Sequence, residues 1–404
     1  MFQVSGCAGR PRPGQAGGVQ TPWDLIVVGA GPAGSAAALG ALRARPGARV
    51  LLLDRSDFPR DKSCGDGLAP HAGDELAALG IAHVLADRVP VHRLRLRAPD
   101  GREVATILQR PDIVIPRTLL DARLVEEAVR AGAVLVRHQV RTLEVLDGVV
   151  VLDGKLRGRA VVGADGANGI VRRRLGLPRQ PAGCLAVAVR GYAAAPPGEP
   201  EQAIVMDSRG WPAYAWSFGA GDGTANVGFG MLLPRLKATG RGGKAELYGR
   251  LRELIPGPEA ERLVTHHLPL STSRPRQPAG PVLLAGDAAS LINPLTGEGI
   301  YYALHSGRLA GIAAVTEADP GTAYAAALKR ELGRHLRHTT ALARLTARAG
   351  VVDAGVAAAG RSPGAFDALV EVGLGRGLIT GPLVRALIGE VGRRMARAVT
   401  SRPS

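Results

Sequence analysis

Runs of apolar residues mark the first strands and helices of the chain. Residues 24–29 (DLIVVG) and 49–53 (RVLLL) are continuous apolar segments, as expected of strands buried on both faces of a parallel sheet. Between them, the Ala-rich segment 32–45 predicts a helix, which the pair Pro46-Gly47 ends. This order of strand, helix and strand predicts a right-handed βαβ unit.

Further along the chain, the pattern predicts short strands first and helices later. A helix is expected over residues 118–131, and short strands are expected at 134–136, 139–146, 149–152 and 158–163. Between residues 180 and 275, alternating apolar and polar positions with glycine-marked bends predict an antiparallel sheet. Apolar strand character returns at 281–285, before a long helix at 297–316 and Ala/Leu/Arg-rich helices to the end.

These elements predict an α/β fold: a discontinuous Rossmann-like nucleotide-binding domain, an inserted antiparallel-β domain and C-terminal helices. We assign residues 23–90, 111–178 and 276–330 to the nucleotide domain, 91–110 and 179–275 to a β-rich substrate domain, and 331–404 to the C-terminal helical region. Residues 1–22 lack the apolar stretch of a secretory signal, and their Pro and Gly content predicts a disordered leader.

Composition narrows the range of partners. The net charge is +16 over 404 residues, but the arginines are spread out and do not alternate with aromatics, so no nucleic-acid partner is expected. An anionic membrane surface is a candidate partner of the basic, amphipathic last helices; a packed helical lid is the alternative. No apolar stretch reaches the length of about 18 residues that a membrane span needs.

The cysteines and histidines indicate the redox state of the compartment and whether a metal site is expected. Three cysteines, an odd number without a pairing pattern, indicate a reducing, cytoplasmic compartment, with the inner face of the membrane as a candidate docking place. The histidines show no metal-type spacing, so no metal site is expected.

The first candidate binding motif is the glycine turn between the first strand and the first helix. Gly29-Ala30-Gly31-Pro32-Ala33-Gly34 has the spacing G-x-G-x-x-G. In this pattern the first glycine permits a tight turn, the second lets the backbone approach a pyrophosphate, and the third lets helix and strand pack closely. Asp54 ends the second strand 20 residues after Gly34, where a carboxylate suits the ribose hydroxyls of a dinucleotide.

A second motif distinguishes FAD from NAD. Residues 285–289 (AGDAA) follow the strand at 281–285, and residues 293–300 (NPLTGEGI) come next. A carboxylate at a strand end, here Asp287, can hold a ribityl hydroxyl of FAD. A helix beginning near Gly297 would direct its positive end at the pyrimidine side of the flavin and stabilise negative charge on the reduced ring. The two motifs together predict FAD.

With a third motif, the chain resembles the FAD-dependent monooxygenase superfamily that has the p-hydroxybenzoate hydroxylase fold. Residues 162–168 (VGADGAN), which include Asp165, match the internal Asp-Gly motif of that superfamily, and Arg117 matches its FAD-contacting arginine. The resemblance covers roughly residues 23–330 and implies that the fold closes around FAD from widely separated segments.

Within the superfamily the chain is most similar to the geranylgeranyl reductase family. Residues 59–68 (PRDKSCGDGL) resemble the cysteine motif of this family, and Tyr214-x-Trp216-x-Phe218 with Gly228-x-Gly230 resembles its aromatic motif. The resemblance implies FAD-dependent saturation of carbon–carbon double bonds in prenyl chains. It implies catalytic roles for Cys64, Tyr214 and Trp216, a substrate cavity at Tyr214, Trp216 and Phe218, and FAD contacts at Gly29, Gly31, Ala33, Gly34, Asp54, Arg55, Cys64, Gly65, Asp66, Gly67, Arg117, Val140, Asp165, Gly166, Gly286, Asp287, Pro294, Gly297, Gly299 and Ile300.

Several of these residues have a structural interpretation as well as a functional one. Cys64 is a candidate proton donor or substrate holder, but cysteine is also often simply buried. The three aromatics alternate along a strand and face one side, where they line a cavity or form a sheet core. Asp66 contacts the flavin or stabilises a turn. Glu298 is a proton relay, or a carboxylate favoured at a helix N-terminus.

The leading functional hypothesis is a flavin-dependent reductase of an isoprenoid chain, such as that of a prenylated quinone or lipid. The alternative is an FAD-dependent monooxygenase or tailoring enzyme acting on an aromatic or polyketide-like molecule, since the same scaffold supports oxygen chemistry. A halogenase is disfavoured because Tyr214 stands where the first tryptophan of its motif is expected, and a non-enzymatic flavin module is disfavoured by the cysteine and aromatic motifs. No second G-x-G-x-x-G occurs in a strand–helix context, so the expected electron donor is external: NAD(P)H, or a separate reductase or ferredoxin.

Overall fold

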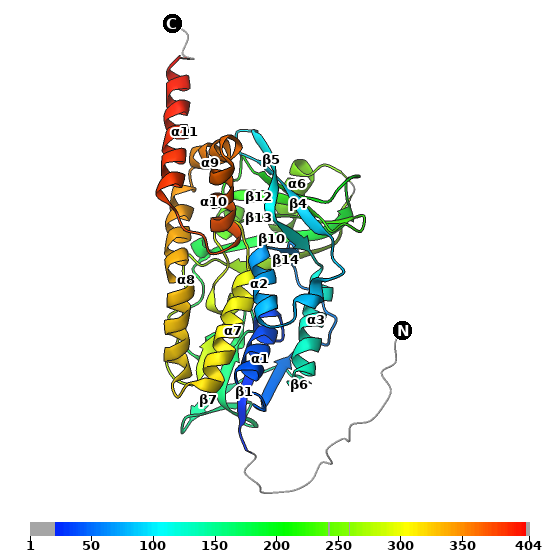
Figure 1. Ribbon diagram of the computed structural model, residues 1–404, viewed down its shortest axis with the longest axis vertical. Coiled ribbons are helices and arrows are strands. Elements are labelled where there is room, and N and C mark those ends of the chain that lie inside the picture. The colour runs from blue at the N-terminus through cyan, green and yellow to red at the C-terminus, as the bar shows by residue number, and fades with distance from the viewer. Residues whose placement is uncertain (1–20, 241–242, 258, 401–404) are drawn as a thin grey trace.

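The computed structural model describes residues 21–240, 243–257 and 259–400, with side chains described up to residue 394. The predicted leader at residues 1–22 lies outside this range except for its last two residues. Within the described range, the strands form two sheets flanked by helices (Figure 1).

The first sheet is built around β1 (Trp23–Val28). Its strand order is β6-β2-β1-β9-β8-β7, with β15 beside β9. The parallel strands are β2 (Val50–Asp54), β6 (Val134–Arg137), β9 (Leu156–Gly163) and β15 (Val282–Leu284); β7 (Leu143–Leu146) and β8 (Val149–Leu152) are antiparallel. Helix α1 (Pro32–Ala44) joins β1 to β2, so the predicted strand–helix–strand unit is confirmed.

Helix α7 (Ile300–Thr316) packs against α1 almost backbone to backbone. A Cβ on Gly307 would lie 2.1 Å from the carbonyl oxygen of Ala33, and a Cβ on Gly311 would lie 1.9 Å from that of Ala37. Glycine at both positions is therefore what allows the two helices to meet. Because α1 carries the glycine turn and α7 follows the 293–300 segment, this packing joins the two predicted motifs.

Apart from α5 (Leu233–Ala238) and α6 (Gly243–Leu254), several further helical elements precede α7 in the chain. They are α2 (Pro70–Ala78), α3 (Arg117–Arg130), the short α4 (Ile170–Arg174) and the 3₁₀ turns η1 (Ala82–Leu85), η2 (Ala182–Cys184) and η3 (Gly286–Ala289). Glu75 of α2 is buried and accepts hydrogen bonds from His305 Nδ1 and Arg308 Nε, each at 2.7 Å. This ion pair fixes α2 to α7.

The second sheet has the order β14-β10-β13-β12-β11-β4-β5-β3. Its strands are β3 (Gly67–Leu68), β4 (Pro90–Arg97), β5 (Glu103–Val114), β10 (Leu185–Ala194), β11 (Glu201–Met206), β12 (Ala213–Gly219), β13 (Thr224–Leu232) and β14 (Glu261–Pro269). Neighbouring strands are antiparallel except β4 and β11, which pair in parallel. Helices α5 (Leu233–Ala238) and α6 (Gly243–Leu254) follow β13.

Two element boundaries differ from the prediction. The strand expected at 139–146 begins only at Leu143, because the backbone N–H groups of Arg141 and Thr142 turn towards Asp153 Oδ1. The helix expected from 297 begins at Ile300. Gly297 has a φ of 76°, which is outside the helical range, so residues 297–299 form a turn that precedes α7.

The C-terminal helices cover one face of the second sheet and continue beside the first. They are α8 (Pro320–Leu345), α9 (Ala349–Arg361), α10 (Pro363–Leu374) and α11 (Gly381–Thr400). Ala359 and Phe366 pack on Leu94 and Leu108 of the sheet. Figure 1 shows α11 extending beyond the body of the molecule to the C-terminal end. Within the residues described, the helices lack the combination of length and apolar character that crossing a bilayer requires.

Candidate functional site

The turn between β1 and α1 has the shape expected of a phosphate cradle. Gly29 has a φ of 100°, and a Cβ there would lie 2.4 Å from the carbonyl oxygen of Ala164, so only glycine fits. At Gly31 a Cβ would meet nothing closer than the Arg60 guanidinium, at 3.4 Å. The turn is therefore tight on the side of the sheet and open on the side of Arg60.

Charged residues gather around the open side of this turn. Asp54, at the end of β2, accepts a hydrogen bond from the N–H of Ala30 at 2.9 Å. Arg60 lies 3.6 Å from Asp54 and 3.2 Å from Asp121. Buried Arg117 donates to both oxygens of Asp121, at 2.6 and 2.8 Å. The structure thus brings Arg117 to the glycine turn, held in place by a carboxylate that the sequence analysis did not select.

The two internal carboxylates of the predicted FAD motifs lie at the ends of neighbouring strands. Asp165 follows β9 and accepts a hydrogen bond from the N–H of Val171 through Oδ2, while its buried Oδ1 has no partner among the described residues. Asp287 follows β15, and its Oδ2 lies 3.2 Å from Lys62 Nζ. Burial raises the pKa of Asp287, but the charges of Lys62 and His266 outweigh it and hold the pKa below its usual value.

Lys62 also approaches Gly166, where a Cβ would lie 3.9 Å from its Nζ. Gly166 has a φ of 78°, a conformation that glycine adopts without strain. The cysteine motif therefore reaches both FAD motifs through this lysine.

The Cys64 loop is held in place by buried polar side chains of the second sheet. Arg190, completely buried on β10, donates to Asp61 Oδ1 at 2.6 Å, to the carbonyl oxygen of Lys62 at 2.9 Å and to that of Cys64 at 3.3 Å. Asn226 of β13 donates to the Cys64 carbonyl oxygen at 2.9 Å. Burial raises the pKa of the Cys64 thiol, so this thiol is neutral at pH 7.

Asp66 occupies a strained place in the same loop. Its φ is 59°, unusual for a residue other than glycine, and its Oδ2 accepts hydrogen bonds from Tyr192 at 2.5 Å and Asn226 at 2.8 Å. Burial raises the pKa of Asp66 to about 6. Asp66 therefore stabilises the turn, and its other oxygen, buried without a partner in the described part of the chain, is left for another ligand.

The aromatic strand β12 lies against the Cys64 loop. A Cβ on Gly65 would lie 3.3 Å from the Phe218 ring and 3.5 Å from the Trp216 indole nitrogen. The Trp216 indole is only 6% exposed and donates to Asn226 Oδ1 at 2.8 Å. Its ring lies over β13 at Gly228, where a Cβ would be 2.1 Å away. Trp216 thus fills the space that the glycine leaves.

Tyr214 connects the aromatic strand to the second FAD motif. Its hydroxyl donates to the carbonyl oxygen of Thr296, and a Cβ on Gly297 would lie 2.9 Å from this hydroxyl. The 293–299 segment is also held by the last turn of α10: Asn293 donates to the Val372 carbonyl at 3.0 Å and Thr296 to the Gly373 carbonyl at 2.6 Å. The site is therefore assembled from four distant parts of the chain.

The remaining predicted FAD contacts occupy several different positions in the structure. Ala33 is buried in α1 where this helix meets α7, and a Cβ on Gly286 would lie 3.0 Å from the Cβ of Ala33. Pro294 and Gly299 lie in the turn before α7, and Ile300 is its first residue. Val140 is buried in the main core. It lies two residues after His138, whose backbone N–H donates a hydrogen bond to the carbonyl oxygen of Asp54. Arg55 is exposed beside Asp54.

Five residues that were not predicted from the sequence hold the predicted site residues in place. They are Arg60, Lys62, Asp121, Arg190 and Asn226. Arg60 and Lys62 stand inside the cysteine motif, so their proximity to Cys64 was a usable signal. Arg190 was also visible as a single charge within the apolar run LAVAVRGY.

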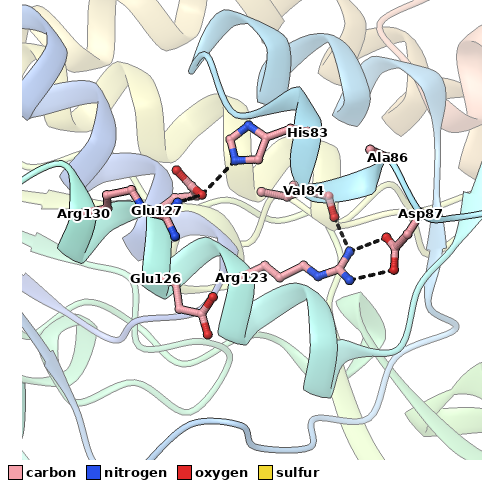
Figure 2. A pocket seen from close by; sticks show the side chains of 8 residues that line it. All are labelled: His83, Val84, Ala86, Asp87, Arg123, Glu126, Glu127 and Arg130. Carbon is pink, nitrogen blue, oxygen red and sulfur yellow. Dashed lines mark hydrogen bonds and ion pairs between the residues drawn. The ribbon is translucent and has the colours of Figure 1, made fainter. Parts of the chain in front are cut away.

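Two surface depressions lie away from this site. One of about 440 Å³ lies between η1 and α3, and Figure 2 shows Arg123 turned towards Asp87 and His83 towards Glu127, with Glu126 apart from them. Arg123 binds Asp87, and Glu127 binds His83 and Arg130. A groove of about 720 Å³ lies between residues 274–279 and α8. Residues predicted for the site line neither of them. Among the described residues, no three His, Cys, Asp or Glu side chains are grouped as a metal would require.

Known proteins place this arrangement in a family. Residues 23–195 match the family model of the FAD binding domain. The menaquinone reductase of Mycolicibacterium smegmatis is 36% identical over 317 residues, which are 72% of this chain and 76% of that protein. The digeranylgeranylglycerophospholipid reductase 2 of Methanopyrus kandleri is 32% identical over 341 residues, which cover 76% and 81% of the two chains. The chain belongs to the geranylgeranyl reductase family.

A solved structure supports the fold of this geranylgeranyl reductase family member. The geranylgeranyl bacteriochlorophyll reductase-like protein of Thermoplasma acidophilum superposes with a TM-score of 0.73 at 21% identity, over 94% of this chain and 98% of that one. The predicted α/β fold with a Rossmann-like FAD-binding part, a second sheet and C-terminal helices is confirmed. The protein is an FAD-dependent oxidoreductase.

Proposed function

We propose that the protein reduces carbon–carbon double bonds of an isoprenoid chain with a hydride from reduced FAD. One observation carries this proposal: the Cys64 loop and the aromatic strand β12 meet the 293–299 segment at one place. The names of the relatives, a menaquinone reductase and digeranylgeranylglycerophospholipid reductases, support the same chemistry. A prenylated quinone or a prenyl lipid is the proposed substrate class.

The residues around the glycine turn fit FAD and define where it is held. Gly29, Gly31 and Gly34 with the N-terminus of α1 receive the pyrophosphate, Asp54 the adenosine ribose, and Asp287 the ribityl chain. Asp165 and Asp66 each keep one buried oxygen without a partner among the described residues, and such an oxygen is ready to accept a hydrogen bond from a ligand. The other predicted FAD contacts surround these residues.

The second sheet supplies the substrate side in this proposal. When bound, reduced FAD supplies the hydride. Tyr214 and Phe218 present apolar ring surface to the prenyl chain, while Trp216 supports the Cys64 loop from behind through Asn226. The neutral Cys64 thiol lies where the substrate meets the cofactor and holds the alkene. Burial of the site keeps water away from the hydride.

The electron donor is external in this proposal. NAD(P)H, or a separate reductase or ferredoxin, is the proposed source of the electrons. The domain division follows from the same scheme: the ranges around the first sheet hold FAD, and residues 91–110 and 179–275 hold the substrate.

The product mass tests this function directly. Purified holoprotein, reduced without oxygen and mixed with a menaquinone or a geranylgeranyl lipid, is expected to yield a product heavier by two hydrogen atoms, read by mass spectrometry. The expected rate depends on the reduced flavin, so oxidised holoprotein is the control. A product heavier by one oxygen atom after air is admitted would instead establish the monooxygenase alternative.

A membrane surface is the proposed place from which the prenyl chain is taken. Val384, Ile388 and Val391 are exposed on α11, Ile388 by 66%, and their spacing puts them on one helical face. α11 is the next helix after α10, whose last turn binds Thr296. We expect the chain to float with vesicles that contain anionic lipid and Ile388→Asp to reduce the bound fraction, with Ile107→Asp, at an exposed position on β5, as the control. Equal flotation of both variants would remove this proposal.

A further inference from the structure

Glu298 lies at the junction between the aromatic strand and the second FAD motif. Its neighbour Gly297 faces the Tyr214 hydroxyl, and a Cβ on Gly299 would lie 3.9 Å from Asp287 Oδ1. Glu298 Oε1 accepts a hydrogen bond from the N–H of Tyr301 at 2.8 Å. The carboxyl group is thus held between the residues proposed for the substrate and those proposed for the flavin.

Titratable groups from five parts of the chain lie within electrostatic range of Glu298. They are Cys64, His71 of α2, Asp112 of β5, Tyr214 of β12 and Tyr302 of α7. Asp112 is 2% exposed, and its Oδ1 has no partner among the described residues. Glu298 is therefore the common neighbour of the cluster, and Asp112 is a second buried carboxyl beside it.

The local structure favours the protonated form of Glu298. A carboxylate next to the N-terminus of a helix normally has a lowered pKa, because the N-terminal N–H groups and the helix dipole stabilise its charge. Here burial outweighs three such N–H groups and raises the pKa of Glu298 to about 7. An acid of this strength is well suited to donate a proton near neutral pH.

The neighbouring groups are less suited to this task. The Cys64 thiol is a weaker acid because burial raises its pKa. Asp287 is paired with Lys62, which keeps it ionised, and Asp66 is engaged by Tyr192 and Asn226. Burial also raises the pKa of Asp112 to about 7, but Asp112 is on β5 and is engaged by Gln202 of β11, whereas Glu298 belongs to the 293–299 segment that the aromatic strand contacts. Among these groups, Glu298 combines acidity with the position between both halves of the site.

We propose that Glu298 is the catalytic acid that protonates the double bond, an inference that rests on the proposed function. The π bond of the alkene breaks, one carbon receives the hydride from reduced FAD, and the adjacent carbon receives the proton of Glu298. The electron pair of the carboxyl O–H bond stays on Glu298, which becomes a carboxylate. FAD ends oxidised, and a proton from solvent restores the acid before the next turnover.

The test is a Glu298→Gln variant, which keeps the size of the side chain and removes the acid. In single-turnover mixing of prereduced holoprotein with prenyl substrate, we expect flavin reoxidation to slow by about 100-fold or more. The rate of the parent chain is expected to fall as pH rises through about 7, because Glu298 loses its proton. The variant is expected to show no such fall in rate over this pH range. Glu317→Gln, an exposed glutamate at the other end of α7, is the matched control and keeps the parent profile.

A second readout does not depend on turnover. Infrared difference spectra of the oxidised holoprotein, parent minus variant, are needed here, because burial also raises the pKa of Asp66 to about 6 and that of Asp112 to about 7, and the bands of both are common to all samples. The parent-minus-Glu298→Gln spectrum is expected to contain a protonated carboxyl band that titrates near neutral pH, and the parent-minus-Glu317→Gln spectrum is expected to lack it. In Asp112→Asn, which removes a like charge nearby, the band of Glu298 is expected to titrate at lower pH.

The outcomes separate this inference from the proposed function. A parent chain that forms no product with two added hydrogens contradicts the proposed function itself. A parent chain that forms it while Glu298→Gln, with its full content of FAD, reacts equally fast contradicts the role of Glu298. The role is also contradicted if the parent-minus-Glu298→Gln infrared spectrum contains no protonated carboxyl band that titrates near neutral pH.

Discussion

A Gly34→Ala variant is expected to bind FAD at least about 100-fold more weakly than the parent chain, or about 2.7 kcal/mol. A Cβ on Gly34 would lie 1.7 Å from the carbonyl oxygen of Gly29. Since this obstacle is backbone, α1 itself has to move away from β1. α1 has no space to do so, because Gly307 and Gly311 of α7 already touch its other side. The turn therefore loses the geometry that Gly31 needs to face the pyrophosphate.

Gly73→Ala is the matched control for this change. Gly73 lies within α2, and a Cβ there would meet nothing within 4 Å. It is expected to keep the FAD affinity and to stabilise the fold by about 0.5–1 kcal/mol, because glycine inside a helix costs about that much. The Kd is measured by titrating the apoprotein into FAD and following flavin fluorescence, with circular dichroism to check folding. A folded Gly34→Ala chain that binds FAD as tightly as the parent would contradict the proposed cradle.

The parts of the site that depend on local spacing were predictable from the sequence. The glycine turn and the 285–289 segment each follow a strand directly, and Asp54 is the last residue of one, so the buried apolar runs located them along the chain. Local signals also placed Asp165 and Asp287 at strand ends, which lie side by side because β9 and β15 pair in parallel.

The parts that depend on contacts between distant segments were not predictable. Arg190 meets Asp61 across 129 positions, and Asn226 meets Cys64 across 162. Such pairs are set by the register of β10 and β13, which one sequence alone does not define. The parallel pairing of β4 with β11 was not predicted, for the same reason. The late start of α7 was missed because a Gly-rich turn and a helix N-terminus share the same residue types.

The cysteine loop shows how these two kinds of information combine. Its motif identified Cys64, but the conformation of the loop comes from side chains of the second sheet. Arg190 alone binds one carboxylate and two carbonyl oxygens from a completely buried position. Its planar guanidinium suits this because it offers several N–H groups in a fixed geometry. Arg190 is therefore a positioning residue for Cys64.

An Arg190→Met variant is expected to release the Cys64 loop and to lose most of the reductase activity. Methionine fills a similar volume but removes the Arg190 donor from the carbonyl oxygen of Lys62 and leaves that of Cys64 with Asn226 alone. Breaking a buried ion pair by removing one partner costs about 3–5 kcal/mol, although Asp61 recovers part of this by turning to water, since its side chain is 38% exposed. We expect iodoacetamide to alkylate Cys64 at least about tenfold faster, as about 1.4 kcal/mol of lost protection implies.

Peptide mapping by mass spectrometry separates alkylation at Cys64 from that at Cys184, which is also free and serves as an internal reference. Arg334→Met, at an exposed position on α8, is the matched control and should leave both rates unchanged. Arg190→Lys is expected to fall between parent and Met variant, because a single ammonium reaches fewer of the acceptors than the guanidinium fork. If Cys64 in Arg190→Met reacts no faster than in the parent while Cys184 is unchanged, Arg190 does not hold the loop, and the position of Cys64 has to come from Asn226 and Asp66 alone.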